Sequence, residues 1–365
     1  MEKTNNHDAL TMKDDNSKTK ICLVTGSNGS HMNAAVFGSN PNYEINIFTR
    51  RPEIFGSEII GISGEGIETW RGKVKLASAD PEKACSGCKI FIISSPANVQ
   101  ESLLRQMKPY LPSNAIIGTI FGQGNFELIA KHVLGEEFIS KEITIFSLFN
   151  IPYTCGALEP GKTVTIMGQE LNTRFCCSPK SSTSMIKSLC EELWQMPSVP
   201  LDNFFEILLA PGNQILHPGR VMGIYENGEV FPMDKMPIFY EEINQTSADN
   251  IEKLSAEIQL IKAEMLRRFP GLCLDAAIPA GEWVCKQYGD QVVDKSSVRT
   301  IFATNRAYRK FKVPVKKVGD KVFVNFEARI LTEDIPFGLC ILKDFAEMLD
   351  LEVPFMTKTL EWGQK

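Results

Sequence analysis

The sequence has no apolar run that approaches the roughly 20 residues of a membrane-spanning helix. It also has no excess of basic residues. Its formal net charge is -5, which argues against nucleic acid and anionic membranes as partners. Residues 1–19 contain no apolar stretch, so we expect a disordered tail there rather than a secretory signal. These absences leave small molecules as the expected partners.

The clusters of His, Cys and Asp that hold a metal ion are also missing from the sequence. The ten cysteines are scattered along the chain, which indicates a reducing compartment. Cys85 and Cys88 form a C-x-x-C pair, but no second pair accompanies them as a zinc site would require. We therefore expect no metal and a cytoplasmic location.

The first half of the chain alternates short apolar runs with helical stretches. Apolar runs that we expect to form buried strands cover 21–24, 44–48, 73–76, 89–94, 115–120, 143–148 and 163–167. Helical stretches between them cover 32–37, 80–84, 100–108, 126–133 and 183–194. This alternation predicts an α/β domain over residues 20–198, with the doubly wound parallel sheet of a dinucleotide-binding Rossmann domain.

Beyond residue 200 the apolar period changes from that of strands to that of helices. Apolar side chains recur every three or four positions at Ile251, Leu254, Ile258, Ile261 and Met265. This stripe predicts a helix over 247–269, and a second helical stretch covers 338–349. Residues 321–326 alternate like an isolated strand. With 365 residues in all, two domains are expected, and 199–365 should be the mainly helical one.

The turn after the first expected strand is rich in glycine. Dinucleotide folds need glycines there, because the backbone must approach the pyrophosphate at a helix N-terminus. We therefore assign a cofactor site to Gly26, Ser27, Asn28, Gly29, Ser30 and His31. The Ser27 side chain could crowd the pyrophosphate, or its hydroxyl could bond a phosphate oxygen. A fold that has kept its sheet and lost its cofactor is the alternative.

The second expected strand ends in Thr49-Arg50-Arg51, without the acidic residue that holds the adenine ribose of NAD. The two arginines offer forked donors for a 2′-phosphate, so NADP is slightly favoured over NAD. An exposed basic turn is the alternative. Ser95 and Pro96 follow the fourth expected strand, where fold geometry places the nicotinamide side of the cofactor.

Histidine is scarce, with four residues in the chain. His7 lies in the polar tail, His31 in the glycine turn and His132 on an amphipathic stretch, so His217 is the best candidate for proton transfer. A carboxylate that fixes the imidazole tautomer and an arginine that holds an anionic substrate would complete such a site. Asp334 and Arg329 suit these roles, although a helix-capping histidine and a surface ion pair are the alternatives.

Two segments carry a resemblance to a known family. Residues 213–220 (NQILHPGR) and 329–339 (RILTEDIPFGL) resemble the octopine/opine dehydrogenase family, and the likeness spans most of 20–365. Such enzymes condense an amino acid with a 2-oxo acid, usually pyruvate, and reduce the imine with NADH or NADPH. The resemblance implies that His217 and Asp334 are a catalytic pair and that Arg329 binds the oxo acid.

The same resemblance marks departures in this chain. The family usually has Gly-Gly-Gly-Asn-Gly-Ala-His in the first turn, where this sequence has Thr25, Ser27 and Ser30 in place of two glycines and the alanine. Relatives often have Leu-Pro-Trp-Ala-Cys-Arg where this chain has Ile-Pro-Tyr-Thr-Cys-Gly at 151–156. These differences leave the preferred amino acid open.

Substrate contacts are expected from both halves of the chain. The resemblance implies that the amino acid is held largely by the helical domain, which makes Trp283 a candidate. Asn213 precedes His217 by one helical turn, and Gln123 follows the fifth strand. Thr154 lies in the loop that differs from relatives. A monomer or homodimer is expected.

Two other functions remain open at this stage. A 2-oxo acid or 3-hydroxy acid dehydrogenase would have the same architecture, but there a lysine commonly moves the proton and no amino acid is needed. A non-catalytic NAD(P)-binding sensor, or a scaffold without cofactor, would fit the altered glycine turn. Activity that depends on an amine would distinguish an opine dehydrogenase from both of these alternatives.

Overall fold

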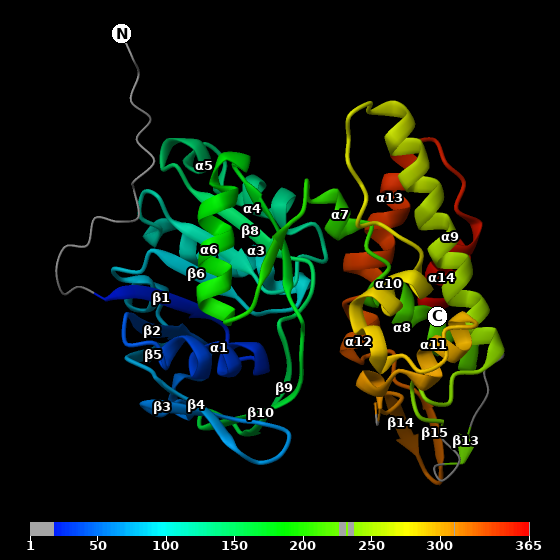
Figure 1. The fold of residues 1–365 in the computed structure, drawn as a ribbon, viewed down its shortest axis with the longest axis horizontal. Coiled ribbons are helices and arrows are strands. Elements are labelled where there is room, and N and C mark those ends of the chain that lie inside the picture. Colours follow the sequence, from blue (N-terminus) through cyan, green and yellow to red (C-terminus); the bar gives the residue numbers. More distant parts are fainter. Residues whose placement is uncertain (1–17, 226–230, 233–236, 310, 365) are drawn as a thin grey trace.

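The structure is a computed structural model that describes residues 18–225, 231–232, 237–309 and 311–364. It has an N-terminal α/β domain and a mainly helical C-terminal domain, which lie side by side (Figure 1). The expected tail lies outside the described residues up to residue 17, and Thr19 already begins the first strand.

An eight-stranded sheet forms the centre of the N-terminal domain, in the order β12-β11-β8-β7-β6-β1-β2-β5. Its strands are β1 (Thr19–Val24), β2 (Tyr43–Phe48), β5 (Leu76–Ser78), β6 (Ile90–Ile93), β7 (Ile116–Thr119), β8 (Thr144–Leu148), β11 (Thr173–Ser178) and β12 (Ser198–Pro200). Six neighbouring strands of this sheet are parallel, in the order β8-β7-β6-β1-β2-β5. This is the Rossmann order, in which ligands bind beyond the carboxyl ends of the strands at β1 and β6.

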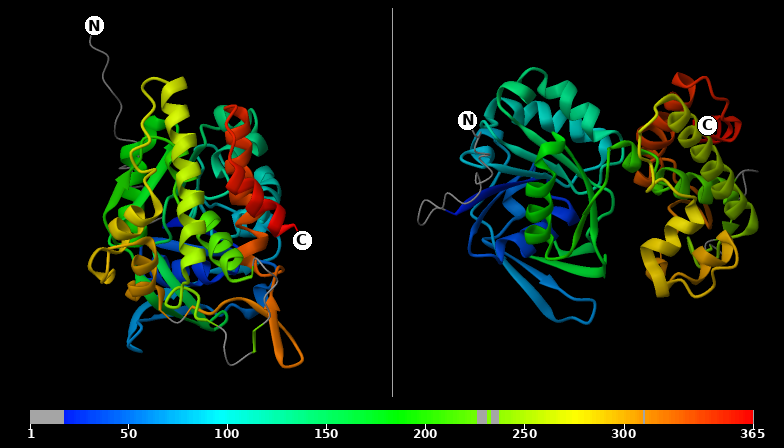
Figure 2. Two further views of the ribbon diagram at one scale, coloured as in Figure 1. Left: turned by 90° about the vertical axis from the view of Figure 1, so that its right-hand side faces the viewer. Right: turned by 45° about the horizontal axis from the view of Figure 1, so that its top comes forward.

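Helices cover both faces of this sheet (Figure 2). They are α1 (Asn28–Gly38), η1 (Pro52–Ile54), α2 (Pro81–Cys85), α3 (Ala97–Met107), η2 (Lys108–Tyr110), α4 (Phe126–Leu134), α5 (Glu137–Ser140), η3 (Lys180–Ser182) and α6 (Thr183–Trp194). Ile21 and Leu23 pack in the core on the α1 side, whereas Cys22 and Val24 pack in the core on the α3 side. A strand buried on both faces must be apolar at every position, which explains the continuous apolar runs.

A second sheet packs beside α1, in the order β4-β3-β10-β9. It consists of β3 (Glu58–Ile62), β4 (Glu68–Lys73), β9 (Tyr153–Glu159) and β10 (Thr163–Gln169). The expected strand 163–167 therefore exists as β10, but it belongs to this sheet and not to the main one. The expected strand 73–76 was wrong, because Lys73 ends β4 and Leu76 begins β5.

The C-terminal domain is built around the long helix α9. Its helices are α7 (Phe205–Leu208), α8 (Asn213–Tyr225), α9 (Gln245–Arg268), α10 (Ala280–Tyr288), η5 (Gly289–Gln291), α11 (Val298–Thr304), η6 (Arg306–Tyr308), α12 (Arg329–Thr332), η7 (Ile335–Leu339), α13 (Cys340–Met348) and α14 (Pro354–Gly363). The apolar stripe predicted for 247–269 is the buried face of α9, which packs against α8.

A three-stranded sheet completes the C-terminal domain. It has the order β13-β15-β14, with β13 (Phe231–Pro232), β14 (Val315–Val318) and β15 (Lys321–Val324). The expected isolated strand over 321–326 therefore pairs on both sides. The expected domain boundary after residue 198 falls inside β12, whose last residue is Pro200 and which still belongs to the main sheet.

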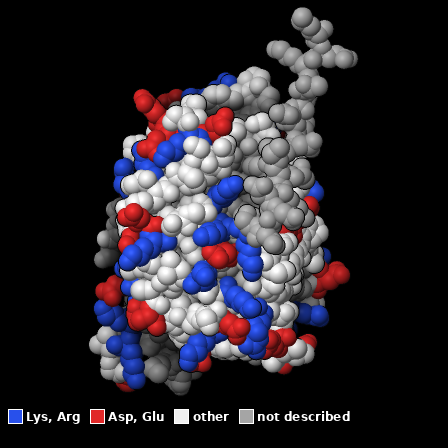
Figure 3. All heavy atoms as spheres, turned by 90° about the vertical axis from the view of Figure 1, so that its left-hand side faces the viewer, with Lys and Arg blue, Asp and Glu red and all other residues white. Residues whose placement is uncertain are grey.

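In the described ranges, no helix is both long and apolar enough to cross a membrane. The same residues contain no group of three or more His, Cys, Asp or Glu side chains that could hold a metal ion. On the face of the α/β domain turned away from the helical domain, basic and acidic side chains are intermingled (Figure 3).

Candidate active site

Helix α8 presents His217 because its glycines let it lie close to α9. A Cβ on Gly219 would lie 3.0 Å from Ile251 Cγ1, and one on Gly223 would lie 2.4 Å from Ser247 Oγ. These close approaches fix the rotation of α8 against α9. His217 then projects from α8 with 16% of its side chain exposed.

The imidazole of His217 is bonded to a buried carboxylate. Its Nδ1 lies 2.7 Å from Oδ2 of Asp334, whose side chain is 5% exposed. The other carboxylate oxygen of Asp334, Oδ1, accepts a hydrogen bond from Gln123 Nε2 over 2.9 Å. A carboxylate can only accept from a neutral imidazole, so Nδ1 carries the proton and Nε2 is the nitrogen that can exchange one.

The same contacts join the two domains. Gln123 follows β7 of the Rossmann domain, whereas Asp334 directly precedes η7 of the helical domain. Beside it, Glu333 Oε1 accepts from the backbone N–H of Ala97 at the start of α3, over 3.1 Å. The site is therefore assembled at the carboxyl edge of the parallel sheet, where this fold binds its ligands.

Arg329 lies one helical turn before Glu333. Its Nη1 is 3.3 Å from Glu333 Oε2, and 69% of the arginine side chain is exposed, compared with 10% for the glutamate. Burial raises the pKa of Glu333, against the opposing effect of the Arg329 charge. The guanidinium thus keeps most of its surface available for an anionic ligand.

Aromatic side chains form a wall beside His217. The ring of Phe239 meets the imidazole edge-on at 5.5 Å, and that of Tyr240 lies at 6.5 Å. Arg220 is fully buried and donates to the backbone carbonyls of residues 238, 239 and 242, which holds this segment in place. No pattern in the sequence marked Phe239 and Tyr240 as site residues. The bonds of Arg220 to this segment are internal to the helical domain.

The glycine turn includes a left-handed backbone conformation, which the glycine usual in the resembled family would adopt easily. Thr25, in place of the first glycine, has φ of +84°, a left-handed value that glycine adopts more easily. A Cβ on Gly26 would lie 2.8 Å from Thr49 Oγ1, and one on Gly29 would lie 2.6 Å from Ile120 Cδ1. Only glycine fits these two positions without movement of the neighbours.

The serines of the turn are engaged within the protein. Ser27 caps α1, because its Oγ accepts from the Ser30 N–H over 3.2 Å. This arrangement gives the hydroxyl a role that the sequence did not reveal. Ser30 itself is fully buried, with Oγ 3.5 Å from the Val24 carbonyl. The Ser30 side chain is therefore turned into the fold, and its predicted place in the cofactor site rests on its position in the turn.

His31 is likewise turned inward. Its side chain is 2% exposed, Nδ1 lies 2.7 Å from the Ser27 carbonyl, and the Gly161 N–H donates to Nε2 over 2.7 Å. Asn28 is exposed, but its Oδ1 accepts from the Ala157 N–H over 3.2 Å. Both ring nitrogens of His31 are engaged within the protein, so we propose an indirect role for its side chain in the cofactor site.

The remaining cofactor candidates surround the turn. Thr49 is buried and its Oγ1 accepts from the Arg51 N–H over 3.3 Å, while the side chains of Arg50 and Arg51 are exposed at the tip of β2. Pro96 precedes α3. The Oγ atom of Ser95 is buried and has no hydrogen-bond partner among the described residues, as is also true of Gln123 Oε1. The tight glycines and these two unpaired oxygens fit a bound dinucleotide and substrate.

The other substrate candidates lie on separate elements of the two domains. Asn213 begins α8, four residues before His217. Thr154 is exposed on β9, in the second sheet. Trp283 of α10 packs near Phe149, with ring centroids 6.4 Å apart, and its indole N–H is buried with no partner among the residues described.

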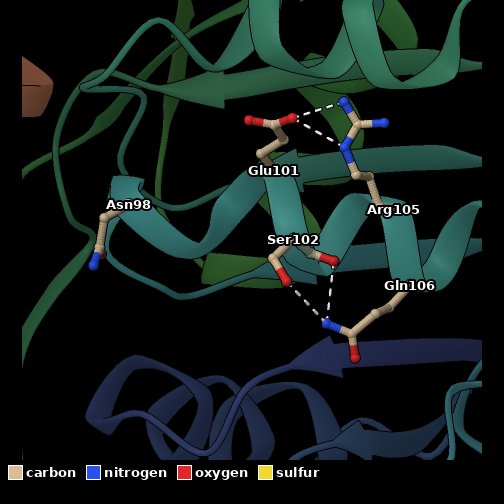
Figure 4. A pocket seen from close by; sticks show the side chains of 5 residues that line it. All are labelled: Asn98, Glu101, Ser102, Arg105 and Gln106. Atoms are coloured by element: carbon tan, nitrogen blue, oxygen red, sulfur yellow. Dashed lines mark hydrogen bonds and ion pairs between the residues drawn. The ribbon is translucent and has the colours of Figure 1, made fainter.

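A hollow on α3 is separate from this group. It is an open depression of about 430 Å³, lined by Asn98, Glu101, Ser102, Arg105 and Gln106 (Figure 4). Glu101 and Arg105 pair across its floor at 2.7 Å. It contains none of the residues that the sequence assigns to chemistry, so we do not include it in the site.

Comparison with known proteins agrees with this arrangement. Residues 200–365 match the family model of the NAD/NADP octopine/nopaline dehydrogenase α-helical domain. The chain is 25% identical to octopine dehydrogenase of Pecten maximus and 26% identical to opine dehydrogenase of Haliotis discus hannai, over 95% of this chain and 90% of each relative. Tauropine dehydrogenase of Arabella iricolor is 25% identical over 94% of this chain and 90% of that protein.

Solved structures resemble the chain over most of its length. A structure of octopine dehydrogenase with NADH and L-arginine has a TM-score of 0.84 at 25% identity, and covers 95% of this chain and 89% of its own. A ketopantoate reductase from Ralstonia eutropha, with a TM-score of 0.62 at 13% identity, shares the fold alone. The matches to octopine and opine dehydrogenases extend through both domains, so the chain is similar over nearly its whole length to this family of NAD(P)-dependent oxidoreductases.

Proposed function

We propose that this protein condenses an amino acid with a 2-oxo acid, pyruvate in the first instance, and reduces the product to an N-(1-carboxyalkyl) amino acid. The observation that carries the proposal is the His217–Asp334 pair at 2.7 Å, placed where loops of the Rossmann domain meet the helical domain. In such a pair the imidazole can act as a general acid or base while the carboxylate orients it.

His217 would act through Nε2. Condensation of amine and oxo acid gives a carbinolamine, whose hydroxyl must leave as water before reduction. The imidazolium donates the proton for that departure, and the neutral imidazole takes a proton back in the reverse direction. Asp334 holds the ring in one tautomer and stabilises its charged form, while Gln123 holds Asp334.

Arg329 would bind the oxo acid through its carboxylate. A guanidinium binds a carboxylate with two parallel hydrogen bonds, which fixes both position and orientation. Its exposure of 69% and its place near Asp334 support this role. In support, one solved relative is described as octopine dehydrogenase bound to NADH and pyruvate.

The glycine turn and its neighbours would hold the dinucleotide, which supplies the hydride when bound. The backbone of Gly26, Ser27 and Gly29 would approach the pyrophosphate, and Ser95 with Pro96 would lie toward the nicotinamide. Exposed Arg50 and Arg51 favour NADP over NAD through the 2′-phosphate. Solved relatives are described with NADH or with NADP⁺, so both cofactors occur within this fold.

The amino acid would lie between the domains, against Asn213, Gln123, Thr154 and Trp283. Relatives are described with L-arginine and with agmatine. The buried, unpaired indole N–H of Trp283 and the unpaired Oε1 of Gln123 are groups that a polar ligand could satisfy. We further propose that the two domains, expected from the sequence at 20–198 and 199–365, act together within a monomer or homodimer.

Product analysis tests this proposal. The protein is incubated with NADPH or NADH, pyruvate and a pool of ¹⁵N-labelled amino acids, and the products are identified by mass spectrometry. We expect a new labelled compound that contains both the amino acid and the three carbons of pyruvate. Lactate without any labelled adduct would instead identify a simple 2-oxo acid reductase. Dinucleotide binding without any product would identify a sensor.

A further inference from the structure

The glycine turn is bonded to the β9–β10 hairpin, and the proposed chemistry does not use this contact. The hairpin lies beside α1 (Figure 1), and two residues of the first turn of α1 bind its backbone. The Gly161 N–H donates to His31 Nε2 over 2.7 Å, and the Ala157 N–H donates to Asn28 Oδ1 over 3.2 Å. We call these two bonds the hairpin clamp.

The clamp requires one protonation state of His31. A peptide N–H can only donate, so Nε2 must be unprotonated to accept from Gly161. The ring proton then lies on Nδ1, from which it is donated to the Ser27 carbonyl over 2.7 Å. His31 is therefore neutral, and it joins the backbone of the glycine turn to that of the hairpin.

The far side of the hairpin turn is held as well. The Gly56 N–H donates to the Gly161 carbonyl over 3.2 Å, and the Phe55 ring lies 4.8 Å from the His31 ring. Gly161 has φ of +79°, and a Cβ there would lie 1.7 Å from the Ile54 carbonyl oxygen. The turn is thus seated between α1 and the segment that follows β2, both of which border the proposed cofactor site.

The hairpin also carries the segment expected to face the amino acid. Strand β9 begins at Tyr153 and includes Thr154, so a shift of the hairpin moves that segment. We propose that His31 and Asn28 are positioning residues, which clamp the β9–β10 hairpin onto the glycine turn and so couple dinucleotide binding to the placement of residues 153–157. This inference rests on the proposed function, because it assigns the dinucleotide to that turn.

The clamp should weaken in acid. Burial has the largest effect on the pKa of His31 and lowers it. The hydrogen bond to the Ser27 carbonyl raises this pKa, and the positive charge of Arg51 lowers it. Glu159 and Lys162 flank the hairpin turn as an exposed ion pair with N and O 2.5 Å apart. The folded protein binds this proton less readily than the unfolded chain. The clamp is therefore intact at neutral pH. It is lost as the pH falls below the pKa of an ordinary histidine and through the lowered pKa of His31.

Replacement of His31 tests the coupling. His31→Leu removes both bonds of the ring, whereas His31→Gln keeps an acceptor for Gly161 that does not titrate. The control is His132→Gln, an exposed histidine on α4. Dissociation constants for NADPH and NADH are measured by fluorescence between pH 5.5 and 8, and kcat is measured at saturating cofactor.

We expect His31→Leu to raise the dissociation constant roughly five- to tenfold at pH 7.5, the effect of about one lost hydrogen bond, with kcat little changed. Wild-type binding should weaken toward pH 5.5, whereas binding by His31→Gln should stay level. Unchanged binding by His31→Leu, or the same pH profile for His31→Gln as for wild type, would overturn the coupling.

A second readout needs no cofactor. Amide hydrogen exchange of residues 153–161 is compared in wild type, Asn28→Ala and Asn28→Asp, since the aspartate keeps an acceptor for Ala157. We expect faster exchange in Asn28→Ala and His31→Leu, and near wild-type exchange in Asn28→Asp and His31→Gln. Equal exchange in all variants would refute the clamp. If wild type binds no dinucleotide, the proposed function fails, while this comparison still decides on the clamp.

Discussion

At the scale of single residues, the account depends on which proton each side chain can hold. Asp334 fixes the tautomer of His217 because it accepts from Nδ1, and its second oxygen is already engaged by Gln123. The sequence could suggest this pair, since histidine is scarce and the two motifs resemble a known family. It could not show the part of Gln123, which comes from the other domain.

Replacement of Asp334 by asparagine should test the tautomer. The amide is nearly isosteric, but it can donate to Nδ1 and so favour the wrong tautomer. We expect kcat to fall by about 10²- to 10⁴-fold with little change in folding. Steady-state kinetics check this, with Asp344→Asn on the exposed face of α13 as the control. An Asp334→Asn enzyme with nearly full kcat would contradict the role.

Arg50 and Arg51 set the prediction for cofactor choice. Each offers charged donors to a 2′-phosphate and nothing comparable to a ribose hydroxyl. We expect the double change to alanine to raise KM for NADPH by about tenfold or more, and KM for NADH by much less. The control is Arg105→Ala, because Arg105 lies on the exposed face of α3. An equal effect on both cofactors would remove the basis for preferring NADP.

Thr25 has a strained backbone, and it stands where the resembled family usually has glycine. Its left-handed φ costs a β-branched residue about 1–3 kcal/mol, part of which is offset by the bond from Oγ1 to the Ser94 carbonyl at 2.9 Å. Thr25→Val keeps the strain and loses the bond, whereas Thr25→Gly loses both. We expect Thr25→Gly to be the more stable of the two by about 1–2 kcal/mol in urea unfolding. The reverse order would show that the strain is absent.

At the scale of elements, periodicity identified most helices and strands but not their partners. The strand at 163–167 exists as β10, yet it pairs in the second sheet, because a short apolar run carries no information on which strand it joins. Exposed Met167 shows that β10 has one open face, unlike the strands of the main sheet. The apolar stripe of α9 was long enough to predict both that the segment is helical and which face of the helix is buried. Both predictions are confirmed.

The contact of α10 with the segment between β10 and β11 supports a prediction on pH. Gln287 of α10 donates to Glu170 and accepts from Arg174 Nη2 at 2.7 Å, so it joins the two domains. Burial raises the pKa of Glu170 from 4.5 to about 7, against the effects of Gln287 and Arg174. The folded protein then binds this proton more tightly than the unfolded chain. Stability falls as the pH rises from 4.5 through 7.

Glu170→Gln should remove this pH dependence, since the amide keeps an acceptor for Gln287 without a charge. We expect the variant to be more stable than wild type at pH 8, by at most about 3 kcal/mol, and similar to it near pH 4.5. Thermal unfolding at the two pH values measures this, with Glu65→Gln in an exposed loop as the control. A variant less stable at pH 8 would show that the charged form holds the interface.

At the scale of the whole molecule, the proposed site lies between two domains, neither of which contains all of its residues. The Rossmann domain supplies the glycine turn and Gln123, and the helical domain supplies His217, Arg329 and Asp334. The order of the domains was predictable from the change in apolar period near residue 200. Their contacts were not, because Glu333 binding to Ala97 joins residues that no local pattern relates.

The central claim is that this two-domain site reduces an oxo acid only in the presence of an amine, by way of His217. The most direct measurement follows NADPH and NADH absorbance with pyruvate, with and without a pool of amino acids, for wild type and His217→Ala side by side. We predict that wild type oxidises the cofactor only when both substrates are present. His217→Ala should lose at least about 10²-fold in kcat while it retains cofactor affinity. Oxidation with pyruvate alone, or a His217→Ala variant with most of the activity, would contradict the account.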